Sequence, residues 1–179
     1  MSVQLIRDAC PNLLHLSLLW NRSFFLHDSP SSRSRFSRLR TVHVSCVDDA
    51  DDGKITDIPT DDLVSILSCP DICSITLNNC QSLTDDVVRM ATHVNRFDKI
   101  VKMELEKCDS VTMEGLDEIL EAHNGLEQLA LEKCENVTKR DVEVYRKKVK
   151  KLNWNINFRE VFRIMRSQGI PSHKEENYV

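Results

Sequence analysis

The chain has 179 residues, of which 41% are hydrophobic and 29% charged, and its formal net charge at pH 7 is −4. This balance is typical of a protein with a buried core, and it does not favour nucleic acid as a partner. No apolar run approaches the roughly 18 residues of a membrane span, and the start, MSVQLIRDACPN, has no signal-peptide core. We therefore expect a cytoplasmic protein without a membrane span, with the nucleus as the alternative compartment.

The N-terminal segment predicts the end of a helix followed by a short strand. Apolar residues have helical spacing within residues 5–10 and alternate within residues 13–18. Because no strand precedes this helix, the first apolar layer would have no polar cover. We expect either that the chain is the C-terminal part of a longer structure or that Met1–Trp20 packs against a partner or a second copy of the chain.

Residues 22–37, RSFFLHDSPSSRSRFS, have the composition of a loop, and a second strand is predicted over residues 39–44. Four arginines lie in this region, which we interpret as solvated, with a phosphate or an acidic partner as the alternative: Arg33, Arg35, Arg38 and Arg40. The acidic segment DDADDGK then begins at Asp48. With Gly53 as the sixth position of a calcium-binding loop, two ligand positions would hold Ala50 and Pro59. We therefore interpret this segment as a solvated acidic loop.

Residues 72–140 contain one motif three times, as ICSITLNNCQSLTDD, IVKMELEKCDSVTME and LEQLALEKCENVTKR. In each copy alternating apolar residues predict a strand, a cysteine follows, and a threonine then caps a helix. The cysteines are Cys80, Cys108 and Cys134, so the period is 28 and then 26 residues. Such a period predicts a solenoid of strand–turn–helix units in which stacked units share one core.

The helices of these units are predicted to pack through residues spaced three and four apart. The predicted helical core residues are Val87, Met90, Ala91 and Val94 in one unit and Leu116, Ile119, Leu120 and His123 in the next. In the preceding unit Val47 takes the cysteine position and precedes Cys80 by 33 residues. We therefore expect a five-residue insertion within DDADDGK, with the segment Ile55–Asp57 as the start of the helix.

The C-terminal segments predict a basic helix and a last strand. Residues 139–151, KRDVEVYRKKVKK, carry seven basic side chains and predict a helix with an exposed basic face, with nuclear localisation or phosphate binding as the alternative. Alternation over residues 152–158 predicts a strand, and residues 160–166 predict a short closing helix. We expect one repeat domain of about five to six units over residues 1–166 and a disordered tail over residues 167–179.

Three stretches carry a family resemblance: CPNLLHLSL at 10–18, CPDICSITLNNCQSLTDDVV at 69–88 and MELEKCDSVTMEGL at 103–116. Their common form, LxLxxCxxLTDxxV, resembles the cysteine-containing leucine-rich repeat of F-box proteins and their relatives, here without an F-box in the sequence. The resemblance covers roughly residues 5–158. It implies an α/β leucine-rich-repeat solenoid, a partial horseshoe with a parallel β-sheet on the concave face and helices on the convex face.

The sequence carries no recognisable catalytic motif. It contains no Gly-rich phosphate loop, no GxSxG elbow and no HExxH helix, and its six histidines are scattered. We expect no enzymatic activity, no cofactor and no metal. The cysteines at equivalent repeat positions are interpreted as buried structural thiols, and the best metal alternative is Cys69 and Cys73 with Cys80.

Outward positions of the predicted strands form three rows across the sheet. The rows are Ser17, His43, Thr76, Glu104 and Ala130; then Leu19, Ser45, Asn78, Glu106 and Glu132; then Trp20, Cys46, Asn79, Lys107 and Lys133. An exposed aromatic residue beside mixed charge suits protein contact. The predicted partner-binding residues are Trp20, His43, Thr76, Asn78, Asn79, Glu104, Glu106, Lys107, Glu132 and Lys133. The alternative interpretation is that the Glu and Lys pairs provide solubility and cross-strand ion pairs.

These features favour a non-enzymatic protein–protein interaction module. The resemblance implies partner or substrate recognition, as in the F-box and leucine-rich-repeat adaptors of ubiquitin ligases. The alternative is an assembly factor for a mitochondrial membrane complex, because some short leucine-rich-repeat proteins without an F-box serve that role. Its expected Arg-rich presequence is missing, since Met1–Trp20 holds only Arg7. Nucleic-acid or phosphoinositide binding through residues 33–40 and 139–151 is disfavoured by the negative net charge, and no small-molecule ligand is indicated.

Overall fold

The structure is a computed structural model that describes residues 3–21, 36–47, 56–120, 125–151 and 157–161. Within these ranges the chain forms an α/β fold of six strands and five helices. In chain order the elements are α1 (Val3–Ala9), β1 (His15–Trp20), β2 (Thr41–Cys46), α2 (Thr60–Leu67), β3 (Ser74–Asn78), α3 (Asp85–Thr92), β4 (Lys102–Glu106), α4 (Met113–Leu120), β5 (Gln128–Glu132), α5 (Lys139–Lys151) and β6 (Asn157–Val161).

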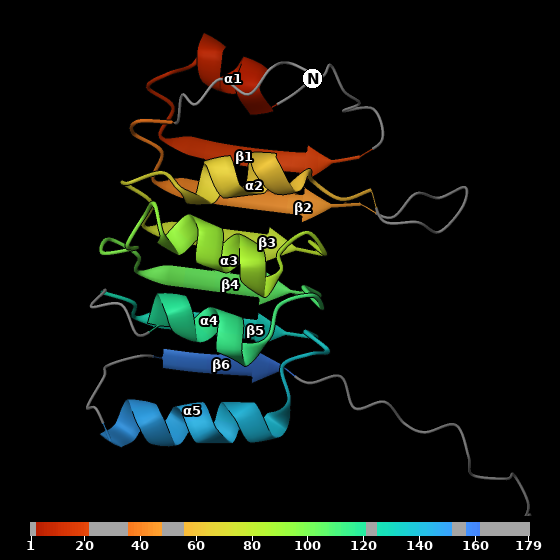
Figure 1. The fold of residues 1–179 in the computed structure, drawn as a ribbon, viewed down its shortest axis with the longest axis vertical. Coiled ribbons are helices and arrows are strands. Elements are labelled where there is room, and N and C mark those ends of the chain that lie inside the picture. Colours follow the sequence, from red (N-terminus) through yellow and green to blue (C-terminus); the bar gives the residue numbers. More distant parts are fainter. Residues whose placement is uncertain (1–2, 22–35, 48–55, 121–124, 152–156, 162–179) are drawn as a thin grey trace, which may run out of the picture.

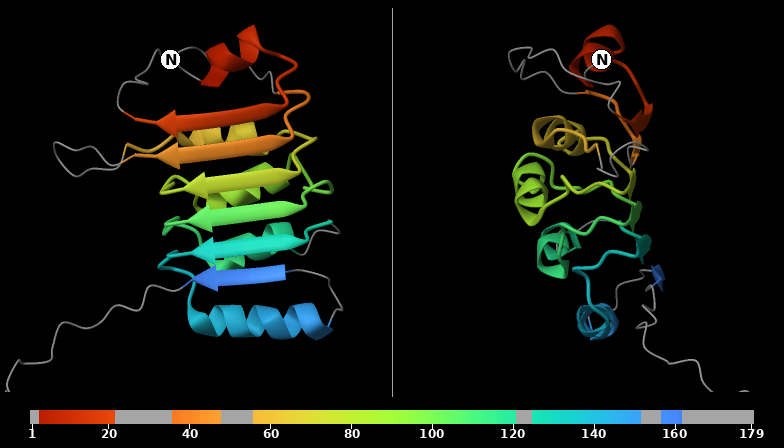
Figure 2. Two further views of the ribbon diagram at one scale, coloured as in Figure 1. Left: turned by 180° about the vertical axis from the view of Figure 1, so that it is seen from behind. Right: turned by 90° about the vertical axis from the view of Figure 1, so that its right-hand side faces the viewer.

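The strands form one parallel sheet in which their order follows the sequence, from β1 at one edge to β6 at the other (Figure 1). Helices α2, α3 and α4 lie side by side on one face of this sheet, and α1 and α5 lie at the two ends of the stack (Figure 2). Among the described residues, the opposite face of the sheet carries no helix. We call it the open face.

The core lies between the sheet and the helices, because alternate strand residues point toward the helices. Two rows of buried residues cross the sheet: Val42, Ile75, Met103 and Leu129, then Val44, Leu77, Leu105 and Leu131. The helices contribute Leu63 and Ile66, then Val87, Val88 and Ala91, then Leu116, Ile119 and Leu120. Burying one such large side chain stabilises the fold by about 1.5–3 kcal/mol.

Two residues that were predicted to belong to the helical core are not buried. Met90 and Val94 are exposed, with 45% and 42% of their surface accessible, whereas Val88 is buried. Val94 lies beyond α3, which ends at Thr92, and Met90 lies within α3 but outside its buried face of Val87, Val88 and Ala91. The predicted core residue His123 lies outside the described residues.

Each repeat changes direction at one residue between its strand and its cysteine. Asn79, Lys107 and Lys133 have φ angles of 54°, 53° and 55°, in the left-handed region that non-glycine residues seldom adopt. The cysteine that follows is buried in each case, as predicted. This turn directs the chain from the end of the strand toward the helical layer.

The threonines that follow cap the helices as predicted. The Thr84 hydroxyl accepts a hydrogen bond from the Val87 amide at 3.3 Å, and that of Thr112 accepts one from the Gly115 amide at 3.4 Å. At α5 the Thr138 hydroxyl accepts from the Asp141 amide at 3.2 Å. A polar side chain at this position satisfies an amide that the first helical turn leaves unpaired.

The second unit departs from the prediction in two ways. Helix α2 begins at Thr60 with Pro59 as its N-cap, rather than after Thr56. The connection from β2 to α2 is therefore longer than a five-residue insertion implies, and the connection from α2 to β3 is correspondingly shorter. The buried residue at the end of β2 is Cys46. Val47, which was predicted at the cysteine position, is 37% exposed.

The two ends of the stack confirm some predictions and correct others. The predicted N-terminal helix is α1, whose Val3 and Arg7 are buried and whose Arg7 Nη1 donates to Ser65 Oγ at 3.3 Å. The last strand is Asn157–Val161, so the predicted closing helix from Glu160 is wrong at its start. The remainder of that helix, the predicted tail and most of the predicted loop over 22–37 lie outside the described residues. No helix in the described part of the chain has the length and apolar character needed to cross a membrane.

Candidate functional site

The open face carries the first two predicted rows of side chains in register. Ser17, His43, Thr76, Glu104 and Ala130 are successive partners across the strands, and so are Leu19, Ser45, Asn78, Glu106 and Glu132. All of them are exposed or partly exposed. The parallel strands thus bring together side chains that come from five separate segments of the sequence.

The third predicted row does not line the open face along its whole length. Trp20, Cys46 and Asn79 are buried, with exposed fractions of 5%, 3% and 8%. Trp20 and Cys46 follow the inward alternation of β1 and β2, and the left-handed turn at Asn79 directs its side chain inward, where Nδ2 donates to the carbonyl oxygen of Cys46 at 3.1 Å. The prediction that Trp20 and Asn79 are exposed for binding is therefore wrong.

Sequence reasoning missed a further row at the amino ends of the strands. His15 pairs with Thr41, and the row continues through Ser74, Lys102 and Gln128. These residues are exposed or half-buried. Each lies two positions before a residue of the first row, so continuing the same alternation by one step would have found them.

Two groups of polar side-chain contacts, most of them between strands, fix side chains on the β3–β5 part of the open face. In the first group, Glu104 Oε2 accepts from Thr76 Oγ1 at 3.2 Å and pairs with Lys102 Nζ at 3.0 Å. In the second, Glu106 Oε2 accepts from Asn78 Nδ2 at 2.8 Å, and Glu106 Oε1 pairs with Lys133 Nζ at 3.3 Å. The two carboxylates therefore have defined positions on the face before any partner binds.

Lys133 balances two carboxylates that would otherwise repel each other. Glu106 and Glu132 are direct neighbours on β4 and β5, and Lys133 Nζ lies 3.3 Å from a carboxylate oxygen of each. Its hydrogen bonds to Glu132 and Glu106 raise the pKa of the Lys133 ammonium above its usual value. Lys107, the corresponding residue of the preceding unit, is exposed. This end of the open face presents both signs of charge.

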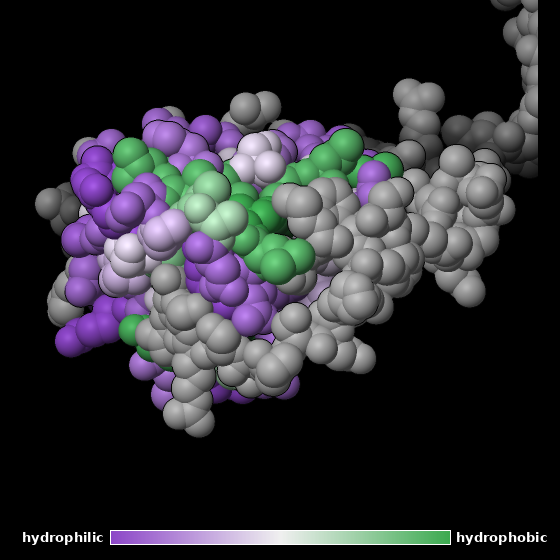
Figure 3. Space-filling view, turned by 90° about the horizontal axis from the view of Figure 1, so that it is seen from above, coloured by the Kyte–Doolittle hydropathy of each residue, from purple (hydrophilic) through white to green (hydrophobic). Residues whose placement is uncertain are grey.

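The β1 end of the stack exposes three leucine side chains. Leu5 and Leu19 are 56% and 59% exposed, and Leu14 is 37% exposed. Seen from this end, hydrophobic surface lies among the polar residues (Figure 3). Because Leu19 belongs to the second row, the open face runs from an exposed apolar residue on the edge strand β1 to charged residues on β4 and β5.

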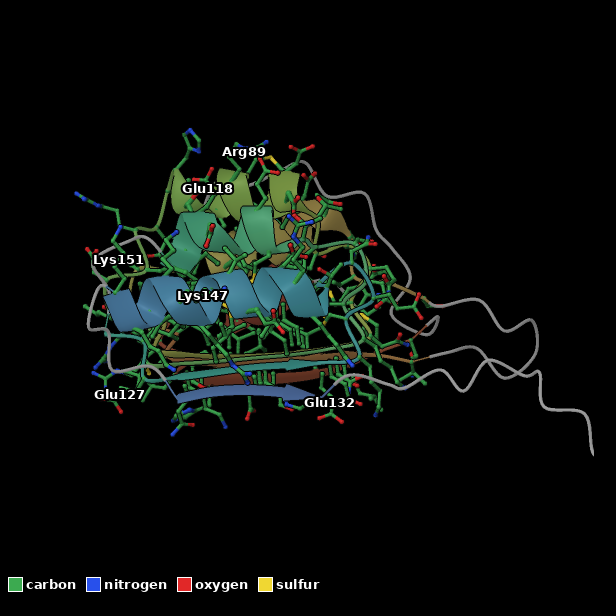
Figure 4. The ribbon with its side chains drawn as sticks, turned by 90° about the horizontal axis from the view of Figure 1, so that it is seen from below. Arg89, Glu118, Glu127, Glu132, Lys147 and Lys151 are labelled. Carbon is green, nitrogen blue, oxygen red and sulfur yellow. The ribbon has the colours of Figure 1, made fainter. Side chains whose placement is uncertain are left out.

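The helical side of the molecule carries charged side chains that lie apart from those of the open face. Arg89 and Glu118 lie there, on α3 and α4, whereas Glu127 and Glu132 lie at opposite ends of β5 (Figure 4). The predicted helix with an exposed basic face is confirmed as α5: six of its seven basic side chains are exposed, and the seventh, on Lys148, pairs with Asp117 at 3.5 Å.

The cysteines are distributed over several environments. All seven lie among the described residues and are free thiols. Cys69 Sγ donates to the Ser65 carbonyl at 3.5 Å and Cys73 Sγ to the Arg40 carbonyl at 3.3 Å, so these two do not form a common site with Cys80. The described residues instead bring Cys80 together with Cys46 and Asp57. The adjacent Cys46 thiol and burial raise the pKa of the Cys80 thiol far above its usual value.

Comparison with known proteins adds no assignment: no protein-family model matches the chain, and no curated protein is similar to it.

Proposed function

We propose that this chain is a leucine-rich-repeat solenoid that recognises a protein partner through the open face and has no catalytic role. The observation that carries the proposal is the open face itself, a parallel sheet with helices on its other side and with polar side chains held in register across five strands. The three sequence repeats, their threonine caps and their buried cysteines support the assignment to this repeat class.

The character of the face favours a polypeptide partner. Glu104 and Glu106 are held by neighbouring strands, so little side-chain ordering is required when a partner binds. The exposed Leu19 at the opposite edge can cover an apolar side chain of the partner. A segment that crosses the strands and carries charged groups of both signs at one end and an apolar anchor at the other would match this distribution.

Substrate recruitment to a ubiquitin ligase is the specific form of the proposal. It rests on the similarity of the repeats to those of F-box and leucine-rich-repeat adaptors, in which the repeats select the protein to be modified. In this form the open face binds the substrate, and the partner set includes components of a cullin-RING ligase.

The experiment is affinity capture from cell extract with two charge-reversal variants. Glu104→Lys with Glu106→Lys alters the open face, and Glu114→Lys with Glu118→Lys makes the same change in net charge on the outer side of α4. Exposed or half-exposed ion pairs contribute little to stability, so both variants should unfold close to wild type. The proposal expects specific proteins to be lost from the first variant and retained by the second. Identical protein sets from both variants and wild type would contradict it.

A further inference from the structure

A compact group of three side chains with metal-binding chemistry lies at the carboxyl edge of the sheet. Cys46 ends β2, Cys80 follows β3, and Asp57 lies in the connection that leads into α2. The two Sγ atoms and one carboxylate oxygen all lie within 4.8 Å of one another. The cysteines are buried, with exposed fractions of 3% and 0%, and Asp57 is half-buried.

Cys80 differs from the cysteines at the equivalent positions of the other repeats. Cys108 Sγ donates to the Leu77 carbonyl at 3.7 Å, and Cys134 Sγ donates to the Leu105 carbonyl at 3.6 Å. The Cys80 Sγ instead lies within 4.8 Å of the Cys46 Sγ, which donates to Asp57 Oδ1 at 3.1 Å. Among the described residues, only this unit brings two thiols and a carboxylate within 4.8 Å of one another.

Asp57 is held in place from two sides. Its Oδ1 accepts from the Ile58 amide at 2.9 Å, and its Oδ2 accepts from the Ser82 amide in the turn after Cys80. Ser82 Oγ also donates to the Ile58 carbonyl at 2.6 Å, which fastens the connection before α2 to the same turn. The carboxylate is thus positioned by the backbone beside the thiols, and the two amides offset part of its charge.

We propose that Cys46, Asp57 and Cys80 form a binding site for a thiophilic divalent cation, for which Zn²⁺ is the best match. Zn²⁺ accepts thiolate sulfur at about 2.3 Å and carboxylate oxygen at about 2.0–2.2 Å in tetrahedral geometry, which places ligand atoms roughly 3.5–3.8 Å apart. The observed separations require only small side-chain adjustments. Mg²⁺ and Ca²⁺ prefer shells of oxygen ligands, so thiolate pairs select against them.

Binding would replace protons by the metal ion. The two thiols release their protons to solvent as the thiolates coordinate, and with the carboxylate they give the occupied site a formal charge of −1. Three protein ligands leave the fourth tetrahedral position to a solvent molecule. The ion would clamp the ends of β2 and β3 to the start of α2, so its role would be structural and independent of the open face.

The test uses the full chain with Cys10→Ser and Cys73→Ser, because these are the cysteines with solvent-accessible side chains and would bind metal adventitiously. The reduced protein, freed of metal with a chelator, is titrated with Co²⁺, whose thiolate complexes absorb through charge transfer in the near ultraviolet. The proposal expects one Co²⁺ per chain, with this absorption, and displacement of Co²⁺ by Zn²⁺. Absence of a thiolate absorption band would overturn it.

Variants on the same background locate the site. Cys46→Ser and Cys80→Ser should each weaken Co²⁺ binding at least tenfold, and Asp57→Asn should also weaken it. Cys108→Ser is the matched control, because Cys108 is buried at the equivalent position of the next repeat, and binding should be unchanged. Equal effects of the Cys46 and Cys108 substitutions would refute the assignment.

A measurement without those substitutions covers the case in which a variant fails to fold. X-ray absorption at the zinc edge on the wild-type chain should give a first shell of two sulfur atoms, with oxygen ligands completing the coordination. A shell without sulfur, or with more than two sulfur atoms, would contradict this donor set. Zn²⁺ should also raise the unfolding temperature, since an ion that binds only the folded state stabilises it.

Discussion

Asn95 is the side chain whose removal should destabilise the stack most clearly. It is 6% exposed and lies after α3, where Nδ2 donates to the carbonyl oxygens of Leu67 at 3.1 Å and Cys69 at 2.7 Å. Its Oδ1 accepts from the Phe97 amide at 3.0 Å. One side chain therefore ties the end of α2 to the connection between α3 and β4.

Asn95→Ala removes these three hydrogen bonds at once. The Cys69 carbonyl keeps its bond from the Ile72 amide at 3.4 Å, so the Leu67 carbonyl and the Phe97 amide bear most of the loss. A buried polar group left unsatisfied costs about 1–3 kcal/mol. Water that enters the vacated space would satisfy part of these two groups. We therefore expect the free energy of unfolding to fall by about 2–4 kcal/mol.

The assay is urea unfolding followed by circular dichroism, with Asn136→Ala as the control. Asn136 Nδ2 also donates to a carbonyl of a neighbouring unit, that of Asp109, but its side chain is exposed. Loss of an exposed hydrogen bond should change stability by only about 0.5 kcal/mol. If Asn95→Ala costs no more than Asn136→Ala, the buried amide does not hold the units together and the reasoning fails.

Three further changes test the turn, the packing between units and the helix cap. Lys107→Gly should raise the unfolding free energy by about 0.5–1 kcal/mol, because relief of the left-handed conformation at φ 53° exceeds the added freedom of the unfolded chain. Gly115→Ala should lower it by about 1–3 kcal/mol despite the better helix propensity of alanine, because the added methyl group would overlap the Asp85 side chain. Thr138→Ala should lower it by about 0.5–2 kcal/mol, because the hydroxyl loses the bond that it donates to the Asp141 carboxylate and the bond that it accepts from the Asp141 amide. The Thr138 hydroxyl and amide hold the pKa of Asp141 below its usual value of 3.8. The carboxylate's contribution to the unfolding free energy is therefore present above about pH 4 and is lost as the pH falls further. The difference in stability between wild type and Thr138→Ala should shrink on acidification.

Each of these changes is measured by chemical or thermal unfolding against wild type, and each has an outcome that contradicts it. A stability gain from Lys107→Val comparable to that from glycine would exclude conformational relief as the cause. Unchanged stability of Gly115→Ala would show that the Asp85 side chain moves aside freely. A Thr138→Ala deficit that grows at low pH would have the wrong sign for a carboxylate whose pKa is depressed in the folded state.

The sheet and the first two rows of the open face could be predicted because a stacked repeat leaves little freedom. Once the strand residues of one unit are aligned with those of the next, parallel pairing places equivalent residues side by side, as at Thr76 and Glu104. Threonine caps were equally predictable, since Thr84 and Thr112 have the same local role. Local pattern and repeat period agree at these positions.

The remaining features depend on where the repeat is broken. Trp20 and Asn79 lie at strand ends. The Trp20 side chain follows the inward alternation of β1, and the Asn79 side chain is directed inward by a left-handed turn. The repeat period in the sequence predicts neither direction. The helix of the second unit begins at Thr60 and has Pro59 instead of a threonine as its N-cap, so its start was misplaced. The Cys46, Asp57 and Cys80 group arises because Asp57, shortly before α2, lies beside the carboxyl ends of β2 and β3, and the only signal in the sequence is the displacement of Cys46 by one position.

Site-specific photocrosslinking in cells is the most direct test of the claim that the open face is the binding surface. A benzophenone amino acid is placed either at Thr76, in the middle of the open face, or at Arg89, on the helical side of the molecule (Figure 4). Thr76 is partly exposed and Arg89 is exposed, so a probe at either position can reach a bound partner. The account predicts a crosslinked adduct of discrete mass from Thr76 and none from Arg89. An adduct from Arg89 with none from Thr76, or the same adducts from both positions, would contradict it.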